Sequence, residues 1–252
     1  MKKYLIGLSL LAIMTGCASK NDTAVVTVNE KDGLLNEDGT VQIKPIYKKM
    51  YKFSEIEKNR YDHPNYVNLH WLHMGDNEYA IVKNIDNKYG IIGKDGKLKL
   101  KVIFDSIGNF FNGYAKIEID KKYGLIDENF NIVVKPIYDE IRNTINGATI
   151  VRNFDKNNKA QYGCLNDKFE LVAPLDYDMI YLANEDRMRI EKDGLWGFMD
   201  TNCNIVAKPQ YKYVNDFSNG KAKVQKPDTL WTYINLDGKE IERKTFNGGF
   251  DF

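Results

Sequence analysis

All three histidines of the 252-residue chain, His63, His70 and His73, lie in one short segment, so any chemistry that needs an imidazole must take place there. Zinc sites use several His or Cys side chains that converge on the ion. His70 and His73 would share a face only in a helix, but the alternating apolar residues at 67–71 favour a strand, which points them to opposite faces. We therefore favour a loop with partly exposed histidines, and a metal-dependent enzyme is the weakest of three hypotheses.

Other arrangements for catalysis are lacking in the sequence. There is no Gly-x-Ser-x-Gly nucleophile turn and no glycine-rich loop of the kind that binds phosphate. Adjacent acids occur at Asp139-Glu140 and Glu185-Asp186, in stretches typical of loops. Two carboxyl groups hydrolyse a glycoside only when they flank the sugar at a defined separation, so we interpret these acids as solvated. We expect no catalytic residue, no metal ligand and no cofactor.

An internal repeat organises the rest of the chain. Each copy has an aromatic residue followed by glycine, a turn, a second apolar run, a proline and a further aromatic residue. The repeat glycines are Gly33, Gly90, Gly124, Gly163 and Gly197, and Thr232 takes this slot in the sixth copy. Pro45, Pro136 and Pro209 share a second slot, and Trp196 is the aromatic residue of the fifth copy. Copy one departs most from the pattern, because Asp32 replaces its aromatic residue.

Each copy has the pattern of β-structure, and no stretch has a sustained helical period. Turns such as Asp95-Gly96 suit the positive φ angles of a hairpin. Proline has no N–H to donate, so Pro136 and Pro209 are expected at a strand end or a sheet edge. A glycine-led strand, for example at 220–224, closes several copies and gives three strands per copy. We expect an aromatic ring from an adjacent strand or repeat to cover the gap beside each repeat glycine.

Trp196-Gly197, followed by a turn and Lys208-Pro209-Gln210-Tyr211, resembles the motif of the bacterial WG-repeat proteins. The likeness extends from near residue 30 to residue 241, and it implies an all-β array used for binding or scaffolding, without shared catalytic residues. We therefore predict an all-β fold of tandem β-hairpin or three-stranded repeats in an open curved array, with a closed β-propeller as the alternative. A single unit cannot bury its apolar face alone, so neighbouring units must stack.

The N-terminus has the pattern of an export signal. Lys2 and Lys3 precede an apolar run at 4–14, which is shorter than the roughly 20 residues of a membrane-spanning helix. The small residues before Cys17 resemble the lipobox of bacterial lipoproteins, which implies a signal peptide at 1–16, a lipid on the Cys17 sulfur and a polar tether that ends at residue 24. Ala18 resembles the residue of lipoproteins sorted to the outer membrane. The alternative is an ordinary signal peptide with an incidental cysteine.

The repeat domain is predicted to cover 25–245, and a tail follows at 246–252. The spacing from Gly33 to Gly90 exceeds the later spacings, which indicates an insertion at about 54–76. Insertions in repeat arrays usually form loops on one face, and that face is often the binding face. We expect a partner-binding element there, with the candidate residues Tyr66, His70, Trp71 and His73.

Two cysteines remain after Cys17. An oxidising compartment would permit a bridge between them. However, Cys164 directly follows a repeat glycine and is expected in the core, whereas Cys203 occupies the turn slot of Gly39 and Gly96. A strand start and a turn tip rarely come within the Cα separation of about 6 Å that a disulfide needs, so we expect no bridge.

The amino-acid composition narrows the classes of partner that the chain could bind. Lys and Arg total 36 and Asp and Glu total 35, with no basic patch, which argues against nucleic acid. Most aromatic residues fall at the same slot in each copy, as a repeated core requires, although exposed rings could also stack on sugars. The leading hypothesis is a non-catalytic, lipid-anchored cell-envelope protein that binds or scaffolds a protein partner, located in the outer membrane or periplasm if the organism is Gram-negative. A glycan- or peptidoglycan-binding module is the second hypothesis.

Overall fold

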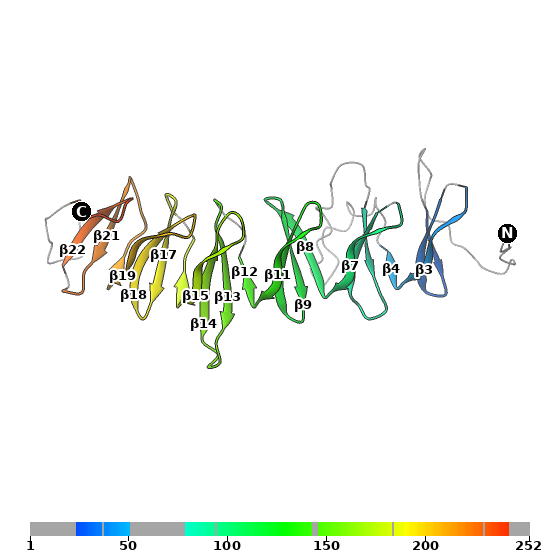
Figure 1. Cartoon of the computed structure of the whole chain (residues 1–252), viewed down its shortest axis with the longest axis horizontal. Helices are drawn as coiled ribbons and strands as arrows, with labels where there is room; N and C mark the ends of the chain where they lie inside the picture. Colours follow the sequence, from blue (N-terminus) through cyan, green and yellow to red (C-terminus); the bar gives the residue numbers. More distant parts are fainter. Residues whose placement is uncertain are drawn as a thin grey trace. The chain divides into compact units, whose positions relative to one another are not determined.

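The computed structural model describes residues 24–36, 38–50, 79–93, 95–142, 146–182, 184–228 and 230–241. The signal peptide, Cys17, the insertion at 54–76 and the tail at 246–252 lie outside the described residues. The described part is all-β, with strands grouped into six antiparallel sheets, none of which closes on itself (Figure 1). The predicted class of tandem β-repeats in an open array is confirmed. Within this part no helix is long and apolar enough to cross a membrane.

The six sheets follow one another in chain order, and within each sheet the strands pair with their neighbours in sequence. The first sheet is β1 (Ala24–Val28), β2 (Lys31–Leu35) and β3 (Val41–Tyr47). The second is β4 (Lys49–Met50), β5 (Tyr79–Lys83), β6 (Tyr89–Gly93) and β7 (Leu98–Phe104). The third is β8 (Ser106–Phe111), β9 (Tyr114–Ile119), β10 (Lys122–Asp127) and β11 (Ile132–Tyr138).

The fourth sheet is β12 (Glu140–Ile141), β13 (Thr149–Phe154), β14 (Ala160–Leu165) and β15 (Leu171–Tyr177). The fifth is β16 (Met179–Ile180), β17 (Arg187–Lys192), β18 (Leu195–Asp200) and β19 (Ile205–Tyr211). The sixth is β20 (Tyr213–Val214), β21 (Lys221–Gln225) and β22 (Trp231–Asn235).

The sheets differ in phase from the predicted repeat unit. The glycine-led strand does not close a copy; it pairs with the aromatic-glycine strand that follows it, as β21 does with β22. A further strand precedes it and makes each of the middle sheets four-stranded; this strand has two residues in β4, β12 and β16 and six in β8. The physical unit is therefore one strand out of step with the unit that the sequence motif suggests.

The repeat glycine is required because the neighbouring backbone bulges toward it. Trp196 pairs with Tyr211 and Phe198 with Ala207, so the single residue Gly197 faces three residues of β19. A Cβ atom on Gly197 would lie 2.4 Å from the Ala207 oxygen and 2.7 Å from the Pro209 nitrogen. The expectation that an aromatic ring fills this gap is wrong, because backbone occupies it. Pro209 lies on the edge strand β19, as expected of a residue without an N–H donor.

The turn after each repeat glycine ends on a residue with positive φ. The Asp200 carboxylate accepts the N–H groups of Asn202 and Asn204 at 2.9 and 2.8 Å and fixes this turn. The third residue after Asp200, Cys203, has a φ of 66°, and Gly96 has a φ of 74° at the same slot. The predicted conformation of the Asp95-Gly96 turn is confirmed. At Cys203 the same conformation is adopted by a residue with a side chain.

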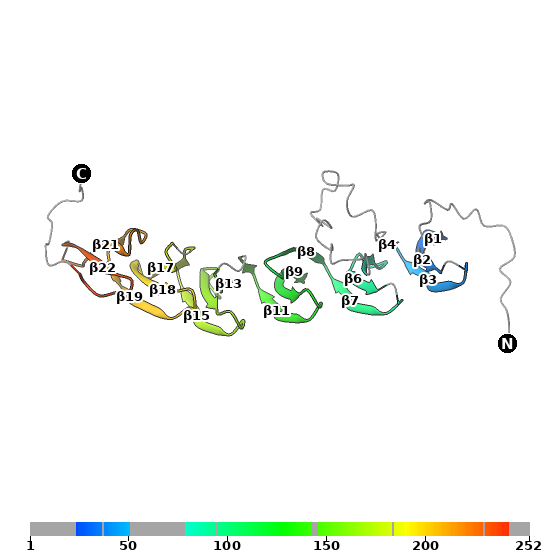
Figure 2. The same ribbon diagram turned by 90° about the horizontal axis from the view of Figure 1, so that it is seen from above.

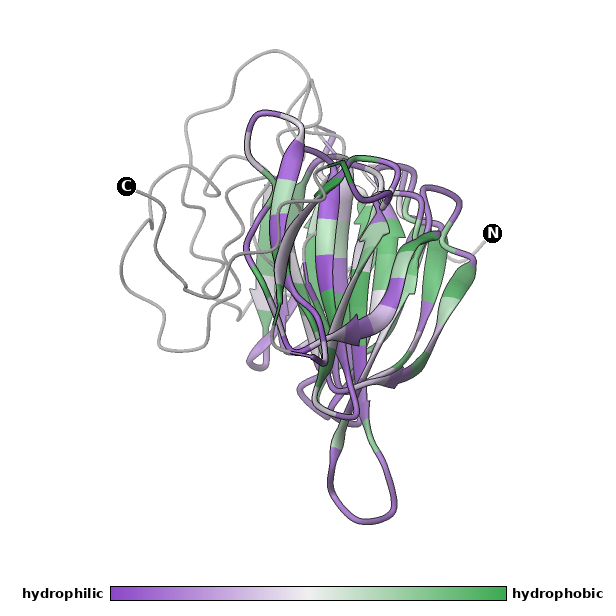
Figure 3. Cartoon of the chain, turned by 90° about the vertical axis from the view of Figure 1, so that its left-hand side faces the viewer, coloured by the Kyte–Doolittle hydropathy of each residue, from purple (hydrophilic) through white to green (hydrophobic). Residues whose placement is uncertain are grey.

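The described residues form two compact units, one within 1–121 and 125–132 and the other within 122–124 and 133–252. In the first unit, neighbouring sheets bury opposite faces of the second sheet, whose strand β6 is buried throughout. Ala80 and Val82 contact Leu34 of the first sheet's cluster, whereas Ile81 belongs to a cluster with Ile117 of the third sheet. Burial on both faces explains why β5 and β6 carry runs of buried residues, and the predicted stacking of units is present. Figure 3 shows hydrophobic and hydrophilic residues along the strands of the sheets that face the viewer.

In the second unit, the same stacking brings the two cysteines together. Cys164 and Cys203 lie in one buried cluster between the fourth and fifth sheets and form a disulfide, with a Cα separation of 5.7 Å. The expectation of no bridge is therefore wrong. Cys164 is in the core and Cys203 is in the turn, as predicted, but the turn of one sheet is seated on the face of the preceding sheet. Slots that are distant within one repeat are neighbours between two repeats.

Candidate binding surface

The candidate residues Tyr66, His70, Trp71 and His73, and the lipidation residue Cys17, lie outside the described residues. The repeat residues are all placed, and their roles are structural: Gly90, Gly124, Gly163 and Gly197 each face the backbone or side chains of the neighbouring strand, and Pro136 and Pro209 lie in edge strands. Within the described part of the chain, no group of three His, Cys, Asp or Glu side chains is placed to hold a metal ion.

In four copies the aromatic residue of the repeat lies beneath a cationic side chain from the preceding strand; these residues are Tyr89, Tyr162, Trp196 and Trp231. The Lys83 ammonium is 4.9 Å from the ring centre of Tyr89, and the Lys223 ammonium is 5.2 Å from that of Trp231. Cross-strand neighbours project from the same face, so a cation in one strand reaches a ring in the next. Tyr89 and Tyr162 are buried, whereas Tyr123, Trp196 and Trp231 are half-buried, so the burial of this residue varies from copy to copy.

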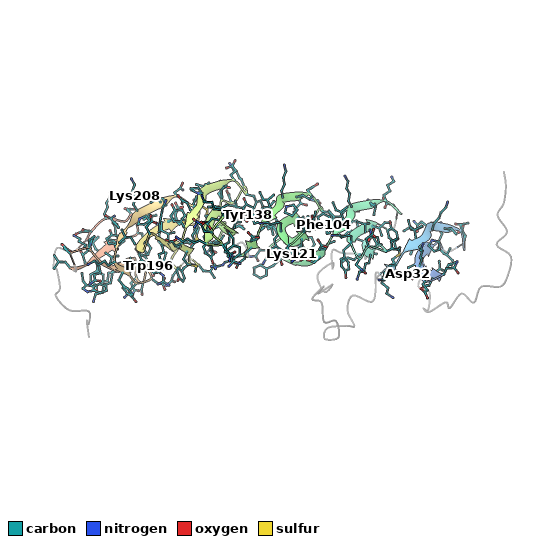
Figure 4. All side chains as sticks on the ribbon, turned by 90° about the horizontal axis from the view of Figure 1, so that it is seen from below. Asp32, Phe104, Lys121, Tyr138, Trp196 and Lys208 are labelled. Atoms are coloured by element: carbon teal, nitrogen blue, oxygen red, sulfur yellow. A yellow bond between two sulfur atoms is a disulfide. The ribbon has the colours of Figure 1, made fainter. Side chains whose placement is uncertain are left out.

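The fifth sheet carries the most elaborate of these arrangements, which we call the arginine–tryptophan cluster: Tyr181, Arg189, Trp196 and Asp216. The Arg189 guanidinium lies 4.8 Å from the Tyr181 ring centre and 5.8 Å from that of Trp196. The two ring centres are 5.6 Å apart. Arg189 Nε is 2.7 Å from the Asp216 carboxylate, which follows β20. Figure 4 labels Trp196 on the side of the second unit opposite Lys208.

The fourth sheet has a related cluster that is more engaged in the structure. Glu140 pairs with Arg152 at 3.0 Å and with Arg142 at 3.4 Å. Arg142 also donates to the Ile180 carbonyl oxygen of the fifth sheet at 3.1 Å and lies 5.2 Å from the Tyr162 ring centre. Tyr162 is buried. These side chains therefore join one sheet to the next, and most of their polar groups and ring surface are already in contact with the protein.

The sixth sheet exposes an aromatic pair. Tyr213 is 51% exposed, and its ring meets Trp231 edge to face with the ring centres 5.7 Å apart. Trp, Tyr and Arg are the residue types that dominate binding at protein interfaces. Half-exposed rings can also stack on sugars. The arginine–tryptophan cluster and the Tyr213–Trp231 pair thus form the candidate binding surface of the second unit.

The adjacent acids of the sequence hold turns in place. Asp139 accepts Lys122 Nζ at 2.8 Å and the Phe154 N–H at 3.0 Å. Glu185 accepts the N–H groups of Asn219 and Gly220 at 2.7 and 2.9 Å. Asp139 and Glu185 therefore each fasten a hairpin of the following sheet. Glu185 and Asp186 are exposed, as the interpretation as solvated acids predicts, whereas Asp139 and Glu140 are half-buried.

Asp139 belongs to a set of acids that directly follow the second aromatic residue of the repeat. Asp105 in the second sheet pairs with Lys88 at 2.6 Å and accepts the Asp120 N–H at 2.8 Å. Asp178 in the fourth sheet pairs with Lys159 and accepts the Asp193 N–H at 2.6 Å. The lysine beside each carboxylate lowers the pKa of Asp105, Asp139 and Asp178. Sequence analysis missed this slot, although the acid recurs there in three copies.

Comparison with known proteins gives one clear result. The model of the WG containing repeat family matches residues 33–55, 89–123, 123–156, 162–196 and 196–227. No curated protein matches the chain.

Solved structures resemble the chain only weakly. Kluyveromyces lactis Hsv2 aligns at 11% identity and a TM-score of 0.30, over 92% of this chain and 80% of that one. BamB from Moraxella catarrhalis aligns at 8% identity and a TM-score of 0.26, over 90% and 74%. The WD40 beta propeller domain of Doa1 aligns at 10% identity and a TM-score of 0.26, over 89% and 79%. Similarity at this level supports no conclusion about the function of this chain.

Proposed function

The chain belongs to the WG containing repeat family, and from this premise we propose that it is a non-catalytic protein, anchored in the cell envelope by a lipid on Cys17, that offers its surface to a protein partner. Its repeats and β fold are those of a protein-interaction module. The observation that carries the proposal is the arginine–tryptophan cluster, where one guanidinium lies over two neighbouring, partly exposed rings. Such side chains are rigid and amphipathic, which suits them to anchor a partner.

The disulfide supports the proposed location. Disulfides form and persist in oxidising compartments, including the bacterial periplasm and the cell surface. The bridge between Cys164 and Cys203 therefore suits a protein that the N-terminal signal exports. Labelling cells with a radioactive fatty acid tests the lipid directly: the wild-type chain incorporates label, and Cys17→Ser does not. Label in the Cys17→Ser chain would contradict the assignment of this residue.

Partner capture from an envelope extract tests the binding function. Tyr181→Ala removes one ring of the arginine–tryptophan cluster, and we expect capture to weaken by about 30-fold, the effect of losing a residue that dominates an interface. Phe154→Ala is the matched control, because Phe154 is an exposed ring that lies 4.8 Å from the Arg152 guanidinium of the fourth sheet. Equal capture by both variants would show that the cluster does not bind the partner.

The insertion at 54–76 is proposed as a second recognition element, in the first unit. Deletion of these residues is expected to leave the repeats folded and to abolish or weaken capture. Circular dichroism checks the fold and the same pull-down checks capture. A deleted chain that unfolds, or that binds as well as the wild type, would remove the insertion from the account. Zinc bound above background in the purified protein would support the hypothesis of a metal-dependent enzyme.

A glycan-binding module is the second candidate, and the exposed Tyr213 ring beside Trp231 favours it. If sugars are the ligand, purified peptidoglycan retains the protein, Tyr213→Ala reduces retention, and the envelope extract yields no stoichiometric protein. Retention that is unchanged by Tyr213→Ala would argue against this surface as a glycan site.

A further inference from the structure

The edge strands of the first unit expose aliphatic side chains at repeated positions. Ile46 in β3 and Ile103 in β7 are 56% and 45% exposed, and they occupy the same slot of the repeat. Val41 and Leu98, which begin these two strands, are each 49% exposed. Figure 2 shows β3 and β7 on the same side of the unit. The turn before β7 reaches β3, since a Cβ on Gly96 would lie 3.6 Å from Ile43 Cγ1.

A lysine accompanies each exposed isoleucine. Lys44 and Lys101 precede Ile46 and Ile103 by two residues and are exposed. Among the described residues neither lysine forms an ion pair or a side-chain hydrogen bond, whereas the nearby Lys99 pairs with Asp95 at 3.1 Å. Neither strand contains an acidic residue. We call the following set the lysine–isoleucine edge: Val41, Lys44, Ile46, Leu98, Lys101 and Ile103.

Protection of the sheet edge accounts for only part of this pattern. Lysine and proline on an edge strand prevent pairing with another chain. That role explains Lys44 and Lys101 but gives no reason for exposed isoleucines beside them. The fold does not require an aliphatic residue at this slot, because Asp176 and Gln210 occupy it in β15 and β19 of the second unit. An exposed isoleucine occupies this slot in β3, β7 and β11, where Ile137 is 55% exposed, so it marks the three N-terminal strands of this kind and is replaced by polar residues in β15 and β19.

We propose that the lysine–isoleucine edge binds the headgroup layer of an anionic lipid bilayer. Exposed aliphatic side chains enter the boundary between headgroups and acyl chains, and lysines attract the lipid phosphates above it. Lys44 and Lys101, which have no ion-pair partner in the part of the chain that the structure describes, and the lack of acids on both strands give the required charge complementarity. The edge thus serves as a second membrane contact, apart from the partner-binding surface.

The N-terminal tether favours a bilayer over an acidic protein. Only six residues separate Cys17 from Ala24, where β1 begins, so an extended chain between them spans at most about 25 Å. A lipid on Cys17 would hold the first unit at this distance and raise its effective concentration at the surface. This argument rests on the proposed lipid anchoring, whereas the exposed edge itself does not.

Vesicle flotation with the full chain carrying Cys17→Ser tests the edge without any attached lipid. The vesicles are phosphatidylcholine alone or an equimolar mixture with phosphatidylglycerol. Lys44→Glu with Lys101→Glu is expected to lower binding to the anionic vesicles by about 20-fold. Ile46→Ser with Ile103→Ser is expected to lower it by about tenfold while its salt dependence stays the same. Every variant carries the same N-terminal segment, so differences report on the edge.

The matched control is Lys31→Glu with Lys121→Glu, which makes the same charge change at two exposed lysines of the first unit, one at the start of β2 and one in a hairpin turn. We expect its binding to stay within about twofold of the parent, because neither lysine belongs to the lysine–isoleucine edge and exposed charges are screened by salt. Equal loss in both charge variants would overturn the proposal, as would equal binding of the parent chain to neutral and anionic vesicles. Capture of an acidic protein by the edge, without vesicle binding, would also overturn it. Absence of an acyl group on Cys17 in cells would defeat the lipid anchor but not this result.

Discussion

The two units use the same slot of the repeat to join neighbouring sheets, but they use different chemistry. In the first unit Phe130 occupies the turn slot, with a φ of 64°, and its ring packs against Tyr79 of the second sheet at 4.9 Å between ring centres. In the second unit Cys203 occupies this slot and bonds covalently to Cys164 of the fourth sheet. In both units the turn contacts the preceding sheet. The residue at the turn slot determines whether this contact is an aromatic packing interaction or a covalent bond.

The units also differ in what they expose. The first unit carries the lysine–isoleucine edge on strands β3 and β7, whereas the second carries the arginine–tryptophan cluster on the fifth sheet. The positions involved exist in both units, and the substitutions at them are compatible with the same backbone. The shared slots therefore support the fold, while the residues that vary between copies give the sheets different exposed side chains.

Loss of the disulfide should produce the largest difference in stability between the two units. The bridge joins residues 39 apart in sequence, and loop entropy for that separation predicts a loss of about 4 kcal/mol of stability in the second unit. Hydrogen exchange with and without a reductant measures this loss strand by strand. The first unit serves as the internal control, because its described residues contain no cysteine. Equal changes in both units would show that the bridge does not act locally.

Phe130→Ala should have the next largest effect, this time on the first unit. Phe130 is 6% exposed in the cluster between the second and third sheets, so its truncation is expected to cost about 3 kcal/mol. Urea unfolding followed by hydrogen exchange locates the change. Phe111→Ala is the control, since Phe111 is 53% exposed. A loss of stability as small as that of Phe111→Ala would mean that the residue at the turn slot contributes little to the contact between the second and third sheets.

Acidification should lower the stability of both units, by less than loss of the disulfide or Phe130→Ala. The pKa values of Asp105 in the first unit and Asp178 in the second are lowered by Lys88 and Lys159. A lowered pKa contributes stability that is present above the unfolded value of about 3.9 and is lost as the pH falls through the folded value. Asp105→Asn with Asp178→Asn should flatten this dependence below about pH 4. An unchanged pH dependence in thermal melts would show that these pairs are too exposed to matter.

The sequence predicted the features that depend on residues close together in the chain. The positive φ at Gly96, the edge position of Pro209 and the all-β class follow from local chemistry. Contacts between repeats could not be read in this way, because nothing in a single copy indicates that Cys203 reaches the preceding sheet. Likewise Asp32 takes the aromatic slot because its carboxylate accepts bonds from Thr27 Oγ1 at 2.7 Å and from the Met50 N–H at 2.8 Å, a pairing that spans two sheets.

The most direct test of the stacked-repeat account transfers the disulfide to the first unit. Ile91 and Phe130 occupy the slots of Cys164 and Cys203 and lie in one buried cluster. The account predicts that Ile91→Cys with Phe130→Cys forms a bridge under oxidising conditions, detected by non-reducing peptide mass mapping. It predicts no bridge for Ile92→Cys with Phe130→Cys, because Ile92 belongs to the cluster on the opposite face of β6. Free thiols in the first variant, or a bridge in the second, would contradict the stacking of sheets through this turn.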